Sequence, residues 1–175
     1  MKIRFATHKD LKDIIIIYNQ AVKAGNATAD TKELKSNDRK DWFFEHTMDR
    51  YPIYILELND ITIGWGSISP YRKGREGLKE TAEISYYLHY NYHGKGYGKI
   101  LIEHMIADCE RIGIKNLIAL LLEVNSKSSW ILEEFGFEKW GFMPDVVNLK
   151  GVRCGHLIYG RKVTIENKAK TNINQ

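Results

Sequence analysis

The sequence predicts one α/β (α+β) domain with a mixed, mostly antiparallel sheet of about seven strands flanked by about four helices. Runs rich in β-branched and aromatic residues alternate with segments of helical apolar spacing, in the order β-α-α-β-β-β-α-β-α-β-β. The 175 residues are 43% hydrophobic and 27% charged, which is ordinary globular composition. Without a repeat or a Pro/Ser-rich linker, we expect a single domain over residues 1–163 and a polar tail over 164–175.

The first strand is expected over residues 2–6. Thr7 and Asp10 then resemble a capping box, with Asp in place of Glu, for a helix that reaches about residue 23. Its inner face consists of apolar residues at helical spacing, namely Leu11, Ile14, Ile15, Tyr18 and Val22. The polar residues 25–37 predict turns.

A second helix is expected to be capped by Asn37 or Asp38. It carries Trp42, Phe43 and Phe44, more aromatic surface than one narrow helical stripe hides, so part of this face is expected to line a cavity. Packing on the sheet is the favoured interpretation for Phe43 and Phe44.

Three antiparallel strands in series are predicted next, over residues 53–58, 61–69 and 82–89. Asn59-Asp60 is a hairpin signal between the first two. Residues 70–79 form the loop before the third.

A glycine-rich turn follows the third strand, where Gly94, Gly96 and Gly98 alternate with Lys95 and Tyr97. Glycines allow positive φ and a close approach of the backbone to a ligand. The helix that begins near Gly98 and runs to about residue 112 adds unpaired N–H groups and the positive end of its dipole. The turn is neither a P-loop nor a dinucleotide fingerprint. It predicts a phosphate cradle, and a turn without a ligand is the alternative.

The last third of the chain predicts a buried strand over residues 116–123. Asn125 and Ser126 are expected to cap a short helix over residues 128–135, which Gly136 ends. Residues 137–147 and 152–161 are expected to form the final pair of strands.

Charge and cysteine content exclude several classes of protein. The net charge of +4 and the scattered basic residues do not indicate nucleic acid as a partner. Cys109 and Cys154 form no C-x-x-C pair, and Cys109 is expected to be a buried structural thiol. The sequence lacks the run of about 20 apolar residues that a membrane span needs and the apolar segment of a signal peptide. We expect a cytoplasmic protein without a metal site.

The segment from His93 to Gly98 resembles the pyrophosphate loop of the GCN5-related N-acetyltransferase (GNAT) superfamily, Q/R-x-x-G-x-G/A, with His93 in place of Gln or Arg. More narrowly, the chain is similar to the phosphinothricin and methionine-sulfoximine acetyltransferase group. The matching segments are Ile17-Tyr18-Asn19, Ala27-Thr28-Ala29-Asp30, Arg39 with Trp42-Phe43, Thr81-Ala82-Glu83-Ile84-Ser85, Asn125 with Ser128, and Phe135-Gly136-Phe137.

This resemblance implies the GNAT acyl-CoA N-acyltransferase fold, whose sheet is splayed between its fourth and fifth strands, and acetyl-CoA as cosubstrate in that opening. Backbone groups of Tyr86, Tyr87 and Leu88 would bind the pantetheine arm. Asn125 and Ser128 would lie beside it, although Asn125 could be a plain helix cap. The pyrophosphate would be held by His93, Gly94, Lys95, Gly96, Tyr97 and Gly98.

Glu83 is the candidate general base. An alkyl amine is mostly protonated at neutral pH and must lose a proton before it attacks a thioester. Because Ala82 and Ile84 face the other way along the strand, Glu83 can point into the cleft, and it matches the Glu of the family's T-x-E-x-S segment. An exposed strand carboxylate is the alternative.

Arg75 matches an Arg that could pair with a substrate carboxylate, and Trp42 and Tyr71 imply a small cleft. The chain departs from the family's pattern at other positions. Leu78 replaces a Tyr, Gly155 or His156 replaces an acid near the last strand, and Leu132 stands where many members have a Tyr that protonates the leaving thiolate. The general acid is therefore unassigned.

These observations predict transfer of an acetyl group from acetyl-CoA to the primary amine of a small amino-acid-like molecule. The alternatives are a polyamine, an aminoglycoside or a protein N-terminus as acceptor, and a CoA-binding sensor that has lost catalysis. The resemblance also implies a homodimer.

Overall fold

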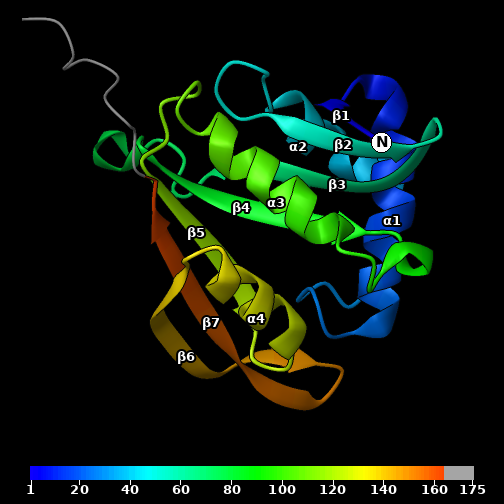
Figure 1. The fold of residues 1–175 in the computed structure, drawn as a ribbon. Coiled ribbons are helices and arrows are strands. Elements are labelled where there is room, and N and C mark those ends of the chain that lie inside the picture. Colours follow the sequence, from blue (N-terminus) through cyan, green and yellow to red (C-terminus); the bar gives the residue numbers. More distant parts are fainter. Residues whose placement is uncertain (164–175) are drawn as a thin grey trace, which may run out of the picture.

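The computed structural model describes residues 1–163, which form one seven-stranded sheet in the order β1-β2-β3-β4-β5-β7-β6 (Figure 1). Only β4 and β5 run parallel, and every other neighbouring pair is antiparallel. The strands are β1 (Lys2–Phe5), β2 (Ile53–Leu58), β3 (Ile61–Pro70), β4 (Thr81–Leu88), β5 (Asn116–Leu122), β6 (Glu138–Leu149) and β7 (Val152–Lys162). The predicted fold class is confirmed. The tail over 164–175 lies outside the described residues.

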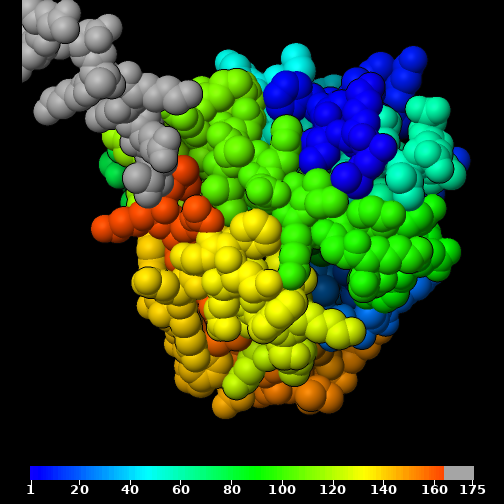
Figure 2. Space-filling view, viewed as in Figure 1, coloured from blue at the N-terminus to red at the C-terminus, as the bar shows by residue number. Residues whose placement is uncertain are grey.

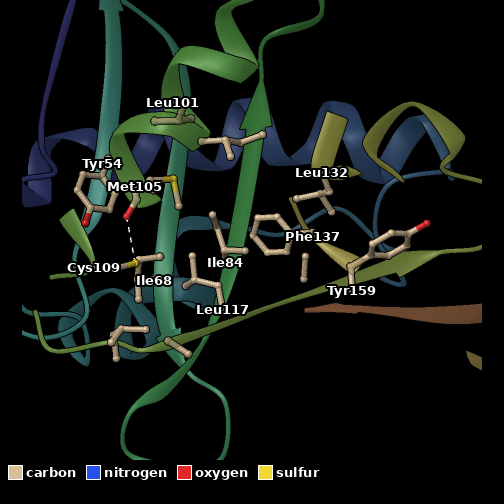
Figure 3. Packing of buried hydrophobic residues seen from close by; sticks show 14 of the residues in the cluster. Tyr54, Ile68, Ile84, Leu101, Met105, Cys109, Leu117, Leu132, Phe137 and Tyr159 are labelled. Carbon is tan, nitrogen blue, oxygen red and sulfur yellow. Dashed lines mark hydrogen bonds between the residues drawn. The ribbon is translucent and has the colours of Figure 1, made fainter. Parts of the chain in front are cut away.

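Four α-helices cover the sheet on two faces: α1 (Leu11–Ala24), α2 (Lys40–Phe44), α3 (Tyr97–Asp108) and α4 (Ser126–Glu134). One buried cluster joins α1 to Ile53, Ile55 and Trp65, with α2 aromatics packed against it. A larger cluster on the other face joins α3 and α4 to the strands, as Figure 3 shows around Met105 and Leu132. In Figure 1, α3 lies in front of the sheet and α1 behind it.

The first turn of the chain is fixed by Asp10. Its carboxylate accepts hydrogen bonds from the Thr7 N–H at 2.7 Å and from the Arg4 guanidinium at 2.7 and 2.8 Å. The expected capping contact is confirmed, although a 3₁₀ turn (His8–Asp10) precedes α1. Gly25, at φ 67°, ends that helix in the left-handed conformation.

The Asn59-Asp60 hairpin is also confirmed. Both residues have positive φ, 51° and 61°, as a type I′ turn requires. It pairs Leu58 with Ile61, and the register between β2 and β3 shifts between Leu56 and Glu57. β2, β3 and β4 are therefore consecutive antiparallel neighbours, as predicted.

Several expectations about helices were wrong. Residues Ser36–Arg39 form a 3₁₀ turn, so Asn37 and Asp38 do not cap α2; the Asp38 carboxylate instead accepts from the Lys35 N–H at 2.7 Å. The α-helix is only five residues long, and Phe44 is 70% exposed rather than packed on the sheet. α3 ends at Asp108, short of residue 112, because the chain turns there before Gly113 at φ 66°.

The sheet opens between β4 and β5. Only Thr81, Ala82 and Glu83 of β4 pair with β5, opposite Asn116, Leu117 and Ile118. Beyond Glu83, β4 stays paired with β3 as far as Leu88, whereas β5 stays paired with β7 as far as Leu122. The two strands therefore diverge toward their C-terminal ends, where the glycine turn and α4 begin. Among the described residues, no helix is both long and apolar enough to cross a membrane.

Candidate active site

Glu83 is the last β4 residue paired with β5, so its side chain lies at the start of the opening. Its register partner on β3 is Ser69, and directly opposed residues share a face of the sheet. The side chain is half-buried, and burial raises the pKa of Glu83, which the Ser85 hydroxyl at 3.5 Å counteracts only in part. A carboxylate with a raised pKa at the mouth of a cleft is suited to accept a proton.

His46 reaches the same face, a contact that no sequence pattern indicates. Its Nδ1 lies 2.6 Å from the Trp42 carbonyl and its Nε2 lies 2.9 Å from Ser69 Oγ. A carbonyl only accepts, so Nδ1 carries the proton and Nε2 accepts from the Ser69 hydroxyl. Burial lowers the pKa of His46 and keeps the ring neutral. The neutral imidazole thus holds the hydroxyl opposite Glu83.

Aromatic rings pack together on the α1 face of the sheet. Trp65 stacks on Tyr87 with ring centres 4.8 Å apart, and Trp42 meets Trp65 edge-on at 5.8 Å. The Arg39 guanidinium lies over Trp42 at 5.2 Å and over Tyr18 at 4.9 Å. Trp42 therefore packs against the buried cluster on this face, and the expectation that part of its helix face lines a cavity stays a prediction.

The glycine turn leaves backbone donors free. Gly94 and Gly96 have φ of 75° and 80°, and a Cβ at either would meet nothing within 4 Å. α3 begins at Tyr97 with Gly96 as its N-cap and without a side-chain cap. Within residues 1–163, the consecutive N–H groups of residues 94–98 donate to no other group. Free amides at a helix N-terminus beside open space suit a pyrophosphate.

His93 contributes differently from the expected side-chain contact with the cradle. Its Nε2 lies 3.0 Å from the Leu88 carbonyl, so the ring is directed back at the end of β4. The positive charges near the turn come from Lys95, whose ammonium lies over the Tyr92 ring at 5.3 Å, and from Lys99.

α4 forms the other side of the opening. Its N-cap, Asn125, accepts a 3.4 Å hydrogen bond from the Ser128 N–H, so Asn125 does cap the helix. In Figure 2 the surface is hollowed between the green segment that contains the glycine turn and the yellow segment that contains α4, with blue atoms visible behind. The residues present on both sides fit an extended cosubstrate arm that ends in a pyrophosphate.

Arg75 and Tyr71 lie on the loop that follows β3. Arg75 is exposed and lines a hollow of about 360 Å³, together with His46, Tyr51 and Arg72. Tyr71, half-buried, carries the Arg72 guanidinium 5.8 Å from its ring centre. Among the described residues, this hollow shares His46 with the Glu83 face but is not lined by Glu83. The structure thus places Arg75 in a neighbouring basic hollow.

Comparisons with known proteins agree with this geometry. The family described as Acetyltransferase (GNAT) domain matches residues 1–138. YwnH of Bacillus subtilis is 33% identical over 165 residues, which covers 94% of this chain and all of that protein. The L-methionine sulfoximine/L-methionine sulfone acetyltransferase of Salmonella typhimurium is 30% identical and covers 89% of this chain and 88% of its own. A phosphinothricin acetyltransferase from Sinorhizobium meliloti, solved in complex with AcCoA, superposes with a TM-score of 0.86 at 26% identity, over 93% of this chain and 88% of that one.

Proposed function

The chain belongs to the GNAT family of acetyl-CoA-dependent N-acetyltransferases, and we propose from this premise that Glu83 is the base that prepares a small amino-acid-like amine for acetylation. The observation that carries the proposal is the position of Glu83, at the point where β4 leaves β5. The glycine turn lies at the far end of the same strand.

The cosubstrate is proposed to lie along the free part of β4. Backbone groups of Tyr86, Tyr87 and Leu88 would hold its arm, the amides of residues 94–98 its pyrophosphate, and Asn125 and Ser128 its other side. Bound acetyl-CoA supplies the acetyl group as a reactive thioester. Glu83 takes a proton from the amine directly or through a water, and the neutral amine then attacks without a covalent enzyme intermediate.

An amino-acid-like substrate is favoured by the relative that acts on methionine sulfoximine and methionine sulfone. We place the reacting amine beside Glu83 and the rest of the substrate toward Trp42. The basic hollow that Arg75 lines would receive a substrate carboxylate, since a guanidinium pairs well with one, and Tyr71 is proposed to contact the substrate from the same loop.

Glu83→Gln tests the role of the base. Loss of the base is expected to lower kcat by at least about 100-fold while the acetyl-CoA Kd stays unchanged, because the side chain's shape is kept. The kcat is measured from thiol release from acetyl-CoA with methionine sulfoximine, methionine sulfone and phosphinothricin as acceptors. The acetyl-CoA Kd is measured by calorimetry. Glu103→Gln, at an exposed position of α3, is the matched control. A Glu83→Gln enzyme with wild-type kcat would remove Glu83 from the mechanism.

The same assay separates the alternatives. Turnover only with a polyamine, an aminoglycoside or a peptide amine would move the substrate to another class, and binding without any turnover would support the sensor. We also propose a cytoplasmic homodimer, whose subunit number sedimentation measures.

A further inference from the structure

The phenol of Tyr86 is a buried polar group that the role of Glu83 leaves unused. Its oxygen is inaccessible to solvent, and it has no hydrogen-bond partner among the described residues. A buried hydroxyl without a partner costs free energy, so such groups usually have a partner or a use. The ring packs against the larger core cluster, so its apolar surface has neighbours and the hydroxyl alone lacks a partner.

Tyr86 stands in the opening of the sheet, on the face opposite Glu83. It lies three residues beyond the last β4–β5 pair, and an odd spacing along a strand reverses the face. Glu83 shares the α1 face with Ser69, whereas Tyr86 packs with the cluster that contains α3 and α4. The Ser128 hydroxyl, in the first turn of α4, is near enough to affect the pKa of the phenol. The side chain thus points across the gap from β4 toward α4.

α4 itself offers no proton donor at Leu132, the position where many GNAT members have a tyrosine that protonates the thiolate. Leu132 is fully buried and packs in the same apolar cluster as Phe137 (Figure 3). A hydroxyl that arrives from β4 instead of α4 would reach the same side of the opening.

We propose that Tyr86 donates a hydrogen bond from its hydroxyl to the sulfur of the thioester and to the thiolate that forms from it. The proposal rests on the proposed function. In the step concerned, the amine nitrogen bonds to the acetyl carbon and the carbon–sulfur bond breaks with its electron pair on sulfur. The nitrogen loses one proton to Glu83 before attack and a second to solvent afterwards. Tyr86 keeps its own proton throughout.

The environment of the phenol is consistent with a donor that is never ionised. Burial raises the pKa of Tyr86 to about 12, the Ser128 hydroxyl lowers it slightly, and no charged side chain among the described residues contributes. A free thiol of this kind has a pKa of about 8.5. At neutral pH the phenol therefore stays protonated beside a thiolate, which can only accept.

The pKa of the thiol of bound CoA tests the proposal without turnover. It is read from the ultraviolet absorbance of the thiolate during a pH titration of the CoA complex. In the wild-type complex the thiol pKa should lie below that of free CoA. Tyr86→Phe should raise this pKa by about one to two pH units, which corresponds to the loss of one hydrogen bond to a charged group. Tyr86→Phe should also lower kcat about 10- to 100-fold with little change in the acetyl-CoA Kd.

Tyr54→Phe is the matched control, because it removes another buried phenolic oxygen, one that donates to Asp108 at 2.7 Å beside α3. It should leave the thiol pKa unchanged. An equal thiol pKa in the wild type and Tyr86→Phe, both folded and CoA-bound, would overturn the proposal. Should Tyr86→Phe fail to fold, a wild-type thiol pKa no lower than that of free CoA would overturn it as well. Absence of CoA binding by the wild type would instead refute the proposed function.

Discussion

At the scale of single residues, the proposed mechanism depends on a carboxylate that is partly desolvated. Burial disfavours the charged form of Glu83, so its pKa is raised and it is a better proton acceptor than a solvated carboxylate. The same burial means that ionised Glu83 works against folding. Function and stability therefore oppose each other at this position.

The pH profile of kcat follows from this. In the proposed mechanism the amine is deprotonated by ionised Glu83, so kcat should fall as pH decreases through the raised pKa of this carboxyl group. A pH series of thiol release with saturating amine measures it. Because the folded-state pKa is raised, the stability contribution is present at low pH and lost as pH rises, so Glu83→Gln should be more stable than wild type near neutral pH. An acidic limb at an ordinary glutamate pKa would contradict the assignment.

Asp10 is the opposite case. Burial alone would raise its pKa, but hydrogen bonds from Arg4 and Thr7 lower it to about 2. A depressed folded-state pKa stabilises the protein above the unfolded pKa and loses this contribution as pH falls through about 2. Asp10→Asn should therefore lower the free energy of unfolding by about 2 kcal/mol near neutral pH, and by less in acid. Urea denaturation measures this, and the exposed Asp13→Asn, which should change little, is the control.

At the scale of elements, the glycine turn should act on binding more than on stability. Gly96→Ala forces a Cβ into a left-handed conformation at φ 80° but meets no neighbour, so the strain is about 1 kcal/mol. Because the turn holds the free amides, the acetyl-CoA Kd should rise about tenfold by calorimetry. Gly25→Ala has the same kind of strain, at φ 67° in open space, far along the chain from the turn. It should cost similar stability and leave the Kd unchanged; equal Kd values in both variants would contradict the cradle.

The β6–β7 hairpin shows a second use of glycine. A Cβ at Gly160 would lie 2.1 Å from Trp140 ring atoms, so the bare backbone lets that ring lie across the neighbouring strand. Gly160→Ala should lower the free energy of unfolding by about 1 to 3 kcal/mol in urea. Gly77→Ala, where nothing lies within 4 Å and φ is not positive, is the control. In a Trp140→Ala background, Gly160→Ala should lower the free energy of unfolding by less than it does in the wild type. An equal loss in both backgrounds would rule out the Trp140 ring as the cause.

These elements also show what sequence alone can predict. Periodicity and caps gave seven strands and four helices, the hairpin at Asn59-Asp60 and the turn at residues 94–98. Patterns of this kind are local, and the predictions made from them were wrong or incomplete where contacts between distant segments determine the structure. The second helix stops after Phe44, the His46 ring is set by Ser69 on another strand, and the unpaired Tyr86 hydroxyl is visible only once β4 and β5 separate. The contact between Gly160 on β7 and the Trp140 ring on β6 likewise depends on how the two strands pair.

At the scale of the whole molecule, the two halves of the sheet are joined by a short parallel contact. Three register pairs connect β4 to β5, compared with seven each for β3–β4 and β5–β7. A cosubstrate in the opening would contact both halves.

Acetyl-CoA should therefore stabilise the fold and protect the opening. At about 100 times Kd, the ligand adds about 2.7 kcal/mol to the free energy of unfolding, seen as a higher thermal midpoint. Hydrogen exchange should slow most for residues 84–88 and 94–98, with β1 and β2 changed least. S-acetylpantetheine, which lacks the pyrophosphate proposed to bind residues 94–98, should give a smaller shift. Slowing confined to β1 and β2 would contradict the placement.

The strand order has a further consequence for how the chain folds during its synthesis on the ribosome. β7 lies between β5 and β6, although it is made after both. Until Val152–Lys162 has emerged, β5 therefore has no partner on one side, and its sequence NLIALLL exposes a bare apolar edge. Such an edge is a template for association between nascent chains. The emergence of β7 thus closes the sheet and ends the period in which this edge is exposed.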